Sequence, residues 1–344
     1  MSGVVGWDIG GVNTKAARVE AGAVLEARCR PFEIQREPRA LSRHLIELAG
    51  QVGTRPSDAH AVTMTAELSQ LFRTKREGVS FVLDAVAAAF RERPVRVYTV
   101  DGRFLTIAAA RREPLAVAAA NWAATARLVA RTHPDAILID VGSTTTDIIP
   151  IVSGALAARG RTDPERLRAG ELVYTGALRT PAEAIAPTVS LAGAPTGVSA
   201  EGFALAGDVH LWRGALAPED YTVPPPDGRP ATRAFAGERL ARVVCADREM
   251  LDDAAITAIA DSLAEAQVAR IAASIEGIRR RLPDLGLAVV TGLGDFLAAA
   301  AARRAGLQVT SLSGVLGGSA ARSAPAAAVA LLVTQVRGTR GHRR

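Results

Sequence analysis

The chain has 344 residues, of which 49% are hydrophobic and 22% charged, a balance typical of a folded globular protein and not of a disordered one. The formal net charge is +6, but arginines alternate with acidic residues and aromatic residues make up only 4%, so no nucleic-acid-binding face is predicted. The longest apolar runs, such as "PAAAVALLV", are shorter than the ~20 residues that a membrane-spanning helix needs. We therefore expect small-molecule substrates and neither nucleic acid nor membrane as a partner. The sequence says nothing about oligomeric state.

The two cysteines, Cys29 and Cys245, lie far apart, and the five histidines show no metal-ligand spacing. This pattern excludes a disulfide framework or a zinc site and favours a reducing compartment. An apolar strand, not a signal peptide, follows the first residues, so we expect a cytoplasmic protein.

The first predicted element is an apolar strand that runs into "GWDIGGVNTK", followed by a glycine turn, a second strand, a turn at Gly22 and a third strand. The same order recurs later in the chain. Residues 7–30 ("WDIGGVNTKAARVEAGAVLEARCR") align without a gap with residues 139–162 ("IDVGSTTTDIIPIVSGALAARGRT"). Asp8 then matches Asp140, Gly10 matches Gly142, and Gly22 matches Gly154. We interpret the two stretches as copies of one duplicated hairpin unit.

Each copy is followed by mixed helical and strand material. Helix-period apolar positions predict helices over "RALSRHLIELAGQV" and "GVSFVLDAVAAAFRER", and "PVRVYTVDGRFLTI" reads as strand, turn and strand. The stretch "EPLAVAAANWAATARLVART" predicts one alanine-rich helix with Asn121 inside it. Further predicted elements are a Pro/Gly-rich loop region from residue 186 to about 233, a long helix near 254–281, a strand, glycine turn and helix in "LGLAVVTGLGDFLAAAAARRAGL", and a last helix from about Pro325.

These elements predict an α/β protein of two lobes with a cleft between them. The first lobe is expected over residues 1–133, with a C-terminal helix at 322–344 packing back on it, and the second over 134–321.

The glycine turns suit phosphate chemistry, because a turn without Cβ atoms exposes backbone N–H groups to an anion. Asp8 and Asp140 could hold a hydrated Mg²⁺ that bridges phosphate oxygens. Lysine occurs only at positions 15 and 75, so Lys15, directly after a glycine turn, is a candidate phosphate ligand. The predicted diphosphate-binding residues are Gly10, Gly11, Asn13, Thr14, Lys15, Gly142, Ser143, Thr144 and Thr145. The alternative is a pair of tight turns with a surface lysine; neither turn is a P-loop or a complete GxGxxG.

A second polar cluster follows the apolar stretch "AHAVTMT" and contains Thr65, Glu67 and Lys75. It is either part of the site or a solvated charged loop. Asn121, one of two asparagines, is either a buried polar tie or a contact in the cleft.

The duplicated Asp-Gly hairpins and the later "VVTGLGDF" element resemble the acetate kinase, sugar kinase, Hsp70 and actin superfamily, whose fold is a duplicated ribonuclease H-like one. The segments "GWDIGGVNTK", "TMTAEL", "LIDVGSTTTDIIPI", "RLRAGELVYTGALRTP" and "ATRAFAGERLARVVCAD" further resemble the family of (4-{4-[2-(γ-L-glutamylamino)ethyl]phenoxymethyl}furan-2-yl)methanamine synthases. That family belongs to methanofuran and methylofuran biosynthesis, and bacterial members are labelled tetrahydromethanopterin-linked C1 transfer pathway proteins. "GELVYTGALRTP" and "TMTAEL" are its specific segments.

The resemblance implies a transferase that joins 5-(aminomethyl)-3-furanmethanol diphosphate to the phenol oxygen of γ-glutamyltyramine, or of a tyrosine-like phenol, and releases diphosphate. Glu67 is then the expected general base, assisted by Lys15 and Lys75, with Asp147 or Glu171 as substitutes. Tyr174, Thr175 and Arg179 are expected to line the cleft, with Asp163 and Asp208 further out, unless they brace the second lobe. An ATP-dependent kinase or hydantoinase-like enzyme of the same superfamily is the main alternative, and a non-enzymatic nucleotide switch is the next.

Overall fold

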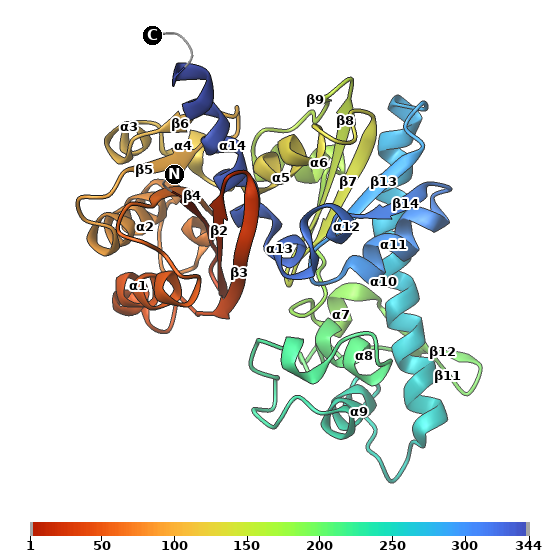
Figure 1. Ribbon diagram of the computed structural model, residues 1–344. Coiled ribbons are helices and arrows are strands. Elements are labelled where there is room, and N and C mark those ends of the chain that lie inside the picture. Colours follow the sequence, from red (N-terminus) through yellow and green to blue (C-terminus); the bar gives the residue numbers. More distant parts are fainter. Residues whose placement is uncertain (1–2, 342–344) are drawn as a thin grey trace. The chain divides into compact units, whose positions relative to one another are not determined.

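The structure, a computed structural model, describes residues 3–341 and side chains as far as residue 334. It divides into two compact units (Figure 1). The first comprises residues 1–136, 149–163 and 311–344, and the second comprises 137–148 and 164–310. The boundary falls inside the second hairpin copy, whereas the sequence prediction placed it before that copy. Residues 1–2 and 342–344 of the predicted first lobe lie outside the described part of the chain.

The first unit is built on a sheet with strand order β3-β2-β1-β4-β5-β6. β1 pairs antiparallel with β2 and parallel with β4, and β4 is parallel to β5. The strands are β1 (Val4–Ile9), β2 (Asn13–Glu20), β3 (Ala23–Pro31), β4 (Ala59–Met64), β5 (Val95–Tyr98) and β6 (Phe104–Leu105). The helices of this unit are η1 (Pro38–Ala40), α1 (Leu41–Gln51), η2 (Ala66–Leu68), α2 (Lys75–Ala89), α3 (Ile107–Arg112), α4 (Pro114–Val117), α5 (Asn121–Val129), α12 (Ser313–Leu316), α13 (Gly318–Arg322) and α14 (Ala324–Gly341).

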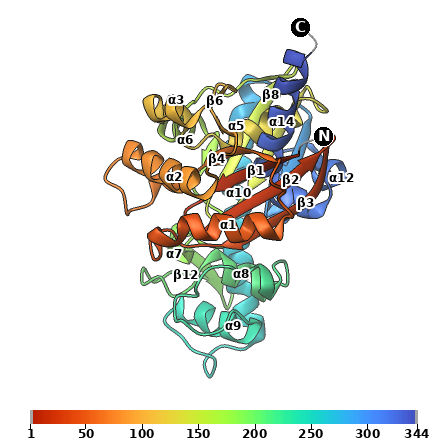
Figure 2. The same ribbon diagram turned by 60° about the vertical axis from the view of Figure 1, so that its left-hand side comes forward.

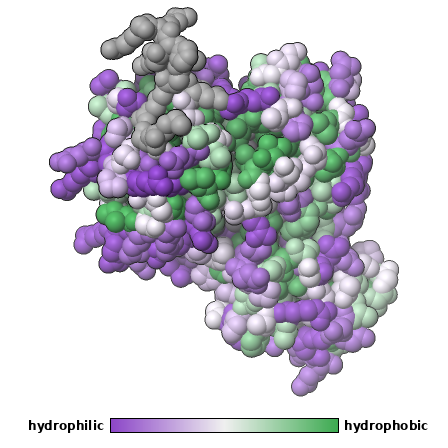
Figure 3. Space-filling model, viewed as in Figure 1, coloured by the Kyte–Doolittle hydropathy of each residue, from purple (hydrophilic) through white to green (hydrophobic). Residues whose placement is uncertain are grey.

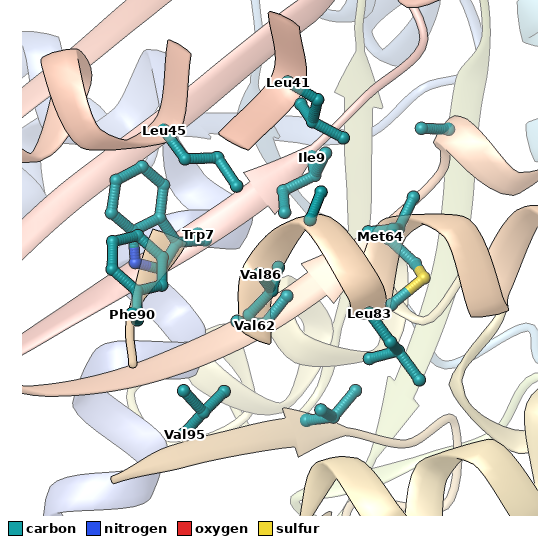
Figure 4. Packing of buried hydrophobic residues seen from close by; sticks show 14 of the residues in the cluster. Trp7, Ile9, Leu41, Leu45, Val62, Met64, Leu83, Val86, Phe90 and Val95 are labelled. Carbon is teal, nitrogen blue, oxygen red and sulfur yellow. The ribbon is translucent and has the colours of Figure 1, made fainter. Parts of the chain in front are cut away.

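The two faces of this sheet are covered differently because side chains alternate along β1. Trp7 and Ile9 point toward α1 and α2 and join a large apolar core with Leu45 and Val86 (Figures 2 and 4). Gly6 points to the opposite face, where α14 packs, and a Cβ there would lie 1.9 Å from the carbonyl oxygen of Ala326. The absence of a side chain at this position is what lets α14 approach β1.

The second sheet repeats the plan of the first. Its order is β10-β8-β7-β13-β14, with β9 also paired to β8, so a hairpin is again followed by parallel strands. The strands are β7 (Ala136–Val141), β8 (Thr146–Val152), β9 (Ala155–Leu156), β10 (Leu172–Val173), β13 (Leu287–Thr291) and β14 (Gln308–Ser311). The other elements of this part are α6 (Asp163–Ala169), α7 (Ala182–Ile185), β11 (Thr188–Leu191), β12 (Ala194–Gly197), α8 (Ala206–Trp212), η3 (Pro218–Asp220), α9 (Arg233–Arg242), α10 (Asp253–Arg281) and α11 (Asp295–Arg304).

The backbone of the two hairpins confirms that they are copies. In the first, the amide of Gly10 donates to the carbonyl of Asn13, at 3.0 Å; in the second, Gly142 donates to Thr145, at 2.9 Å. The next turn has positive φ at both central residues in each copy, at 51° and 82° for the pair 21–22 and at 50° and 75° for the pair 153–154. This is the geometry of a two-residue hairpin with the twist that adjacent strands require.

Two sequence expectations are wrong in detail. The alanine-rich stretch is not one helix, because the chain leaves α4 at Ala118, bridges to Met64 beside β4, and passes Ala119 with a φ of 48° before α5 begins at Asn121. The region 186–233 is not all loop either, since it contains β11, β12, η3 and α8. The apolar residues of α8 pack with α9 and α10 in a second core, which the surrounding Pro and Gly residues obscured.

Long helices elsewhere match the sequence prediction. α10 spans Asp253–Arg281, and β13 and α11 follow it as strand and helix. Within residues 3–341, no helix is at once long enough and apolar enough to cross a membrane. The surface over α1 and α2 is mostly hydrophilic (Figure 3).

Candidate functional site

The first hairpin places its lysine against its aspartate. Lys15 and Asp8 are direct cross-strand partners in β1 and β2, and the Lys15 Nζ lies 3.5 Å from the Asp8 Oδ2. Asp8 is almost buried, whereas the Lys15 side chain keeps a quarter of its surface exposed. The ammonium therefore offsets the charge of a buried carboxylate and stays partly exposed, an arrangement that suits the compact cation of a lysine.

The first turn itself is open to a ligand. A Cβ built on Gly11 would meet nothing within 4 Å, and Gly10, Gly11 and Asn13 are all partly exposed. Thr65 lies beside the turn, since its amide donates to the carbonyl of Ile9 and its hydroxyl would be 3.5 Å from a Cβ on Gly10. Thr14 is different, because it is fully buried with Ile9 as its cross-strand partner. The structure therefore gives no support to the predicted diphosphate contact of Thr14.

Glu67 is a carboxylate held in an apolar position. It lies on η2, is 2% exposed, and neither of its oxygens makes a hydrogen bond of normal geometry. Its backbone is fixed by Gly78 of α2, where a Cβ would lie 2.5 Å from the Glu67 carbonyl oxygen. Burial raises the pKa of the Glu67 carboxyl to about 7, while Lys75 and the amides of Glu67 and Ala119 lower it only in part. Such a carboxyl can take up and release protons at neutral pH.

Lys75 lies between this carboxyl and a second acid. It is the first residue of α2, whose N-cap is Thr74. Its Nζ donates to the Asp163 Oδ2 at 2.7 Å and lies 4.0 Å from the Glu67 Oε1. The Lys75 and Asp163 side chains are partly exposed, whereas that of Glu67 is buried beneath them. The structure thus joins the predicted cluster of Glu67 and Lys75 and adds Asp163, which all lie in the first unit.

Asn121 begins α5 instead of lying inside a helix, and it is partly buried. Its carbonyl accepts a hydrogen bond from the Thr125 hydroxyl. Two residues earlier, Ala119 occupies the left-handed region that non-glycine residues rarely adopt, with its amide near Glu67. Strained backbone of this kind often accompanies functional sites.

The second turn, residues 142–145, is partly exposed throughout and is braced from behind by the segment "YTGALRT". The amides of Leu178 and Arg179 both donate to the carbonyl of Ser143. A Cβ on Gly176 would lie 2.5 Å from the Thr144 nitrogen, so only glycine fits against the turn. The segment that marks the family in the sequence therefore shapes the turn.

A buried network holds this bracing segment in place. Gln267 of α10 donates from its Nε2 to the Thr175 hydroxyl and to the Gly176 carbonyl, both at 2.8 Å, and its Oε1 lies 2.9 Å from His210. The Thr146 hydroxyl donates to the Thr175 carbonyl at 2.7 Å. Thr175 is thus a buried brace in this structure and not an exposed contact.

The central aspartates of the two hairpins, Asp8 and Asp140, each have a threonine as their parallel strand partner. In the parallel pairings, Asp8 lies opposite Thr63 on β4, and Asp140 lies opposite Thr291 on β13. The following Gly292 approaches the aspartate closely, since a Cβ there would lie 2.4 Å from the Asp140 Oδ1. Sequence reasoning missed Thr63 and Thr291, although both follow a valine at the end of an apolar strand, in "AVTM" and "AVVTG".

The substitute bases are paired with arginines. Asp147 forms an ion pair with buried Arg166, and fully buried Glu171 lies 2.5 Å from the Arg281 guanidinium. Asp208 is likewise buried and paired with Arg239. Tyr174 and Arg179 are exposed beside the second turn. The ion pairs suit structural roles better than proton transfer, so Glu67 is the stronger candidate for the base.

The Mg²⁺ site stays a prediction. Among residues 3–341, no three His, Cys, Asp or Glu side chains come together in a way that could hold a metal ion. Mg²⁺ usually keeps several waters and needs only one or two carboxylates besides substrate phosphates. Asp8 lies near the end of β1 and Asp140 near the end of β7, so each of these carboxylates stays a predicted ligand.

Sequence comparison decides the family. The profile of the hydantoinase/oxoprolinase family matches residues 58–336. The chain is 39% identical, over 85% of its length, to the (4-{4-[2-(γ-L-glutamylamino)ethyl]phenoxymethyl}furan-2-yl)methanamine synthase of Methanocaldococcus jannaschii, of which it covers 86%. The chain belongs to this synthase family. The synthase of Methanococcus vannielii is 38% identical over 46% of this chain and 71% of its own length.

The relatives are named as synthases, so family membership supports an enzyme and does not favour the ATP-dependent alternatives. Among solved structures, a ROK family glucokinase from Streptomyces griseus covers 97% of this chain and 100% of its own, with a TM-score of 0.50 and 15% identity. This likeness concerns the fold alone, and it agrees with the predicted two-lobed α/β fold.

Proposed function

We propose that the protein is a transferase of methanofuran or methylofuran biosynthesis. It joins the CH₂ group of 5-(aminomethyl)-3-furanmethanol diphosphate to the phenol oxygen of γ-glutamyltyramine or a tyrosine-like phenol, and releases diphosphate. Two observations support the proposal: the identity to a named synthase over most of both chains, and the nearly neutral pKa of buried Glu67. The second carries the chemistry, because a phenol has a pKa near ~10 and must lose its proton to react.

In the proposed reaction, the phenol oxygen attacks the furan-bound CH₂ carbon. The bond between that carbon and the diphosphate oxygen breaks, and diphosphate leaves with the electron pair. Glu67 takes the phenol proton, which is why its carboxyl must be ionised beforehand. Lys15 and the open amides of the first turn, and separately the Ser143–Thr145 hydroxyls and amides, are suited to the charge that develops on the leaving group.

Mg²⁺ is the proposed cofactor, with Asp8 and Asp140 as its candidate ligands. When bound, the ion would neutralise charge on the diphosphate. Asp8 already faces Lys15, so we expect any metal at this carboxylate to be held largely through water and the substrate.

The experiment is turnover by the purified protein with the furan diphosphate and a panel of phenols in Mg²⁺ buffer. Mass spectrometry should detect one ether product and one diphosphate per turnover, and the panel identifies the phenol. The absence of an ether product with every phenol tested, despite a folded protein, would contradict the proposal.

ATP separates the proposal from its main alternative. The substrate already carries its activation as a diphosphate ester, so apyrase-treated substrates should react at the same rate, and inorganic diphosphate should inhibit in competition with the furan diphosphate. A strict need for ATP, with phosphate released in step with product, would favour a kinase-like enzyme instead.

A further inference from the structure

The Lys75 ammonium has two acidic neighbours and is bonded to only one. It donates to Asp163 at 2.7 Å, while the Glu67 Oε1 is 4.0 Å away, beyond hydrogen-bond distance. Lys75 on α2 is a cation close to Glu67, and Asp163 stands at the start of α6, from where its negative charge raises the pKa of Glu67. The amide of Ala119, in the segment before α5, lowers that pKa.

A lysine beside a buried carboxylate would ordinarily pair with it, because the attraction is stronger away from water. Full pairing would make Glu67 a weak base, since an adjacent cation favours the ionised form of a carboxyl. In the observed arrangement the Lys75 ammonium is near enough to attract an ionised Glu67 carboxylate, but its hydrogen bond goes to Asp163. Something must therefore hold Lys75 back, and Asp163 is the group that accepts its hydrogen bond.

We propose that Asp163 is a positioning residue that holds the Lys75 ammonium away from Glu67, so that this carboxylate is available to accept the proton of the phenol. The proposal rests on the proposed function for its chemical purpose, but the arrangement can be tested without any substrate. Asp163 itself touches no reacting atom. It acts on the base through the position of Lys75.

The test is the titration of Glu67, followed by its carboxyl ¹³C chemical shift and assigned by its loss in Glu67→Gln. In Asp163→Asn, Lys75 is released toward Glu67, and the midpoint should move to lower pH by about one unit or more. In Lys75→Met the midpoint should move to higher pH. When Asp163→Asn is added to Lys75→Met, it should shift the Glu67 midpoint clearly less than it does in the wild-type background, because its action needs the Lys75 ammonium.

Asp163→Glu keeps the charge and should restore the wild-type titration in large part. The matched control is Asp84→Asn on α2, an exposed carboxylate paired with Arg111, which should leave the midpoint unchanged. An unchanged midpoint in Asp163→Asn would overturn the proposal. So would an equal shift with and without Lys75, which would mean that Asp163 acts only by its own charge.

Turnover gives the second readout. The acidic limb of the pH profile of kcat should move with the titration, and the plateau should fall by about tenfold in Asp163→Asn, because a less basic carboxylate removes the proton less well. If the titration shifts as expected but no ether is formed by any variant, the positioning role stands and the proposed reaction falls. If ether forms but the Glu67 midpoint does not move in Asp163→Asn, the proposed reaction stands and the positioning role falls.

Discussion

The two hairpins share one backbone and differ in what surrounds it. Both turns close with the same hydrogen bond, at 3.0 and 2.9 Å, and both lead to a turn with two positive φ angles. Around the first, a buried acid, Glu67, makes no hydrogen bond of normal geometry through its carboxyl and has a raised pKa. Around the second, Asp147 and Glu171 are paired with arginines, and the turn is backed by Gly176.

Under the proposed function, this difference gives the two copies different main roles. The second copy has what an anion cradle needs, namely exposed hydroxyls and amides on a rigid support. The first copy has what proton transfer needs, namely a carboxyl whose charge state changes near neutral pH. A shared scaffold therefore does not imply shared chemistry, and each prediction below tests one of these roles.

The largest effect is expected for Glu67→Gln, which keeps the shape and removes the base. We expect kcat to fall by about 10²- to 10⁴-fold with little change in KM for the furan diphosphate. Steady-state kinetics checks this. Asp147→Asn is the matched comparison from the second copy. It should lower the thermal midpoint because it removes a charged partner of buried Arg166, while kcat of the folded fraction stays close to wild type. A larger loss of kcat in Asp147→Asn than in Glu67→Gln would reverse the assignment.

Gly176→Ala should damage the second turn, because the new Cβ would lie 2.5 Å from the Thr144 nitrogen and that backbone must move. We expect the inhibition constant of inorganic diphosphate to rise by about ten- to a hundredfold, as for other displaced binding groups. Gly197→Ala in the same unit has open space around it and is the control. Unchanged inhibition by diphosphate in a folded Gly176→Ala protein would show that this turn does not bind the anion.

Lys15→Arg tests whether the lysine at the first turn takes part in the reaction. The charge is kept, but a guanidinium is larger than an ammonium and cannot replace it opposite Asp8 and beside an open glycine turn. We expect kcat/KM to fall by about tenfold, with the same melting temperature. Near-wild-type kcat/KM would mean that Lys15 serves only to neutralise Asp8.

Much of this arrangement was predictable from the sequence. The gapless match of the two copies predicted both turns, because turn geometry depends on local residues such as Gly22 and Gly154. The strand partners Thr63 and Thr291 were not found, because register between distant strands is set by tertiary pairing. The break at Ala119 was hidden for a similar reason: alanine favours helix, and only the bridge from Ala118 to Met64 outweighs that preference.

The burial of Glu67 was also beyond the sequence, in which "TMTAELSQ" reads equally well as an exposed loop. The decisive contact is with Gly78, which lies on the next helix and appears in the sequence as an ordinary helical glycine. A bracing role in the second lobe was one of two interpretations left open for Tyr174, Thr175 and Arg179. The hydrogen bonds of Thr175 with Gln267 and Thr146, and of the Arg179 amide with Ser143, favour it for Thr175 and Arg179.

The last expected effect concerns stability, and its sign follows from the raised pKa of Glu67. The carboxyl titrates at about 7 in the folded protein and at about 4.3 when unfolded, so between these values the folded state binds more protons. Stability from this group is therefore fully present below the unfolded pKa and is lost as pH rises through about 7. Glu67→Gln carries no charge at any pH and mimics the protonated form. We expect its advantage in stability over wild type to grow by roughly 2–3 kcal/mol between pH 5 and pH 8. Denaturant unfolding at both pH values measures the difference. A difference that is the same at pH 5 and pH 8 would mean that Glu67 is not buried as a free acid, and the contrast between the two hairpins would lose its main support.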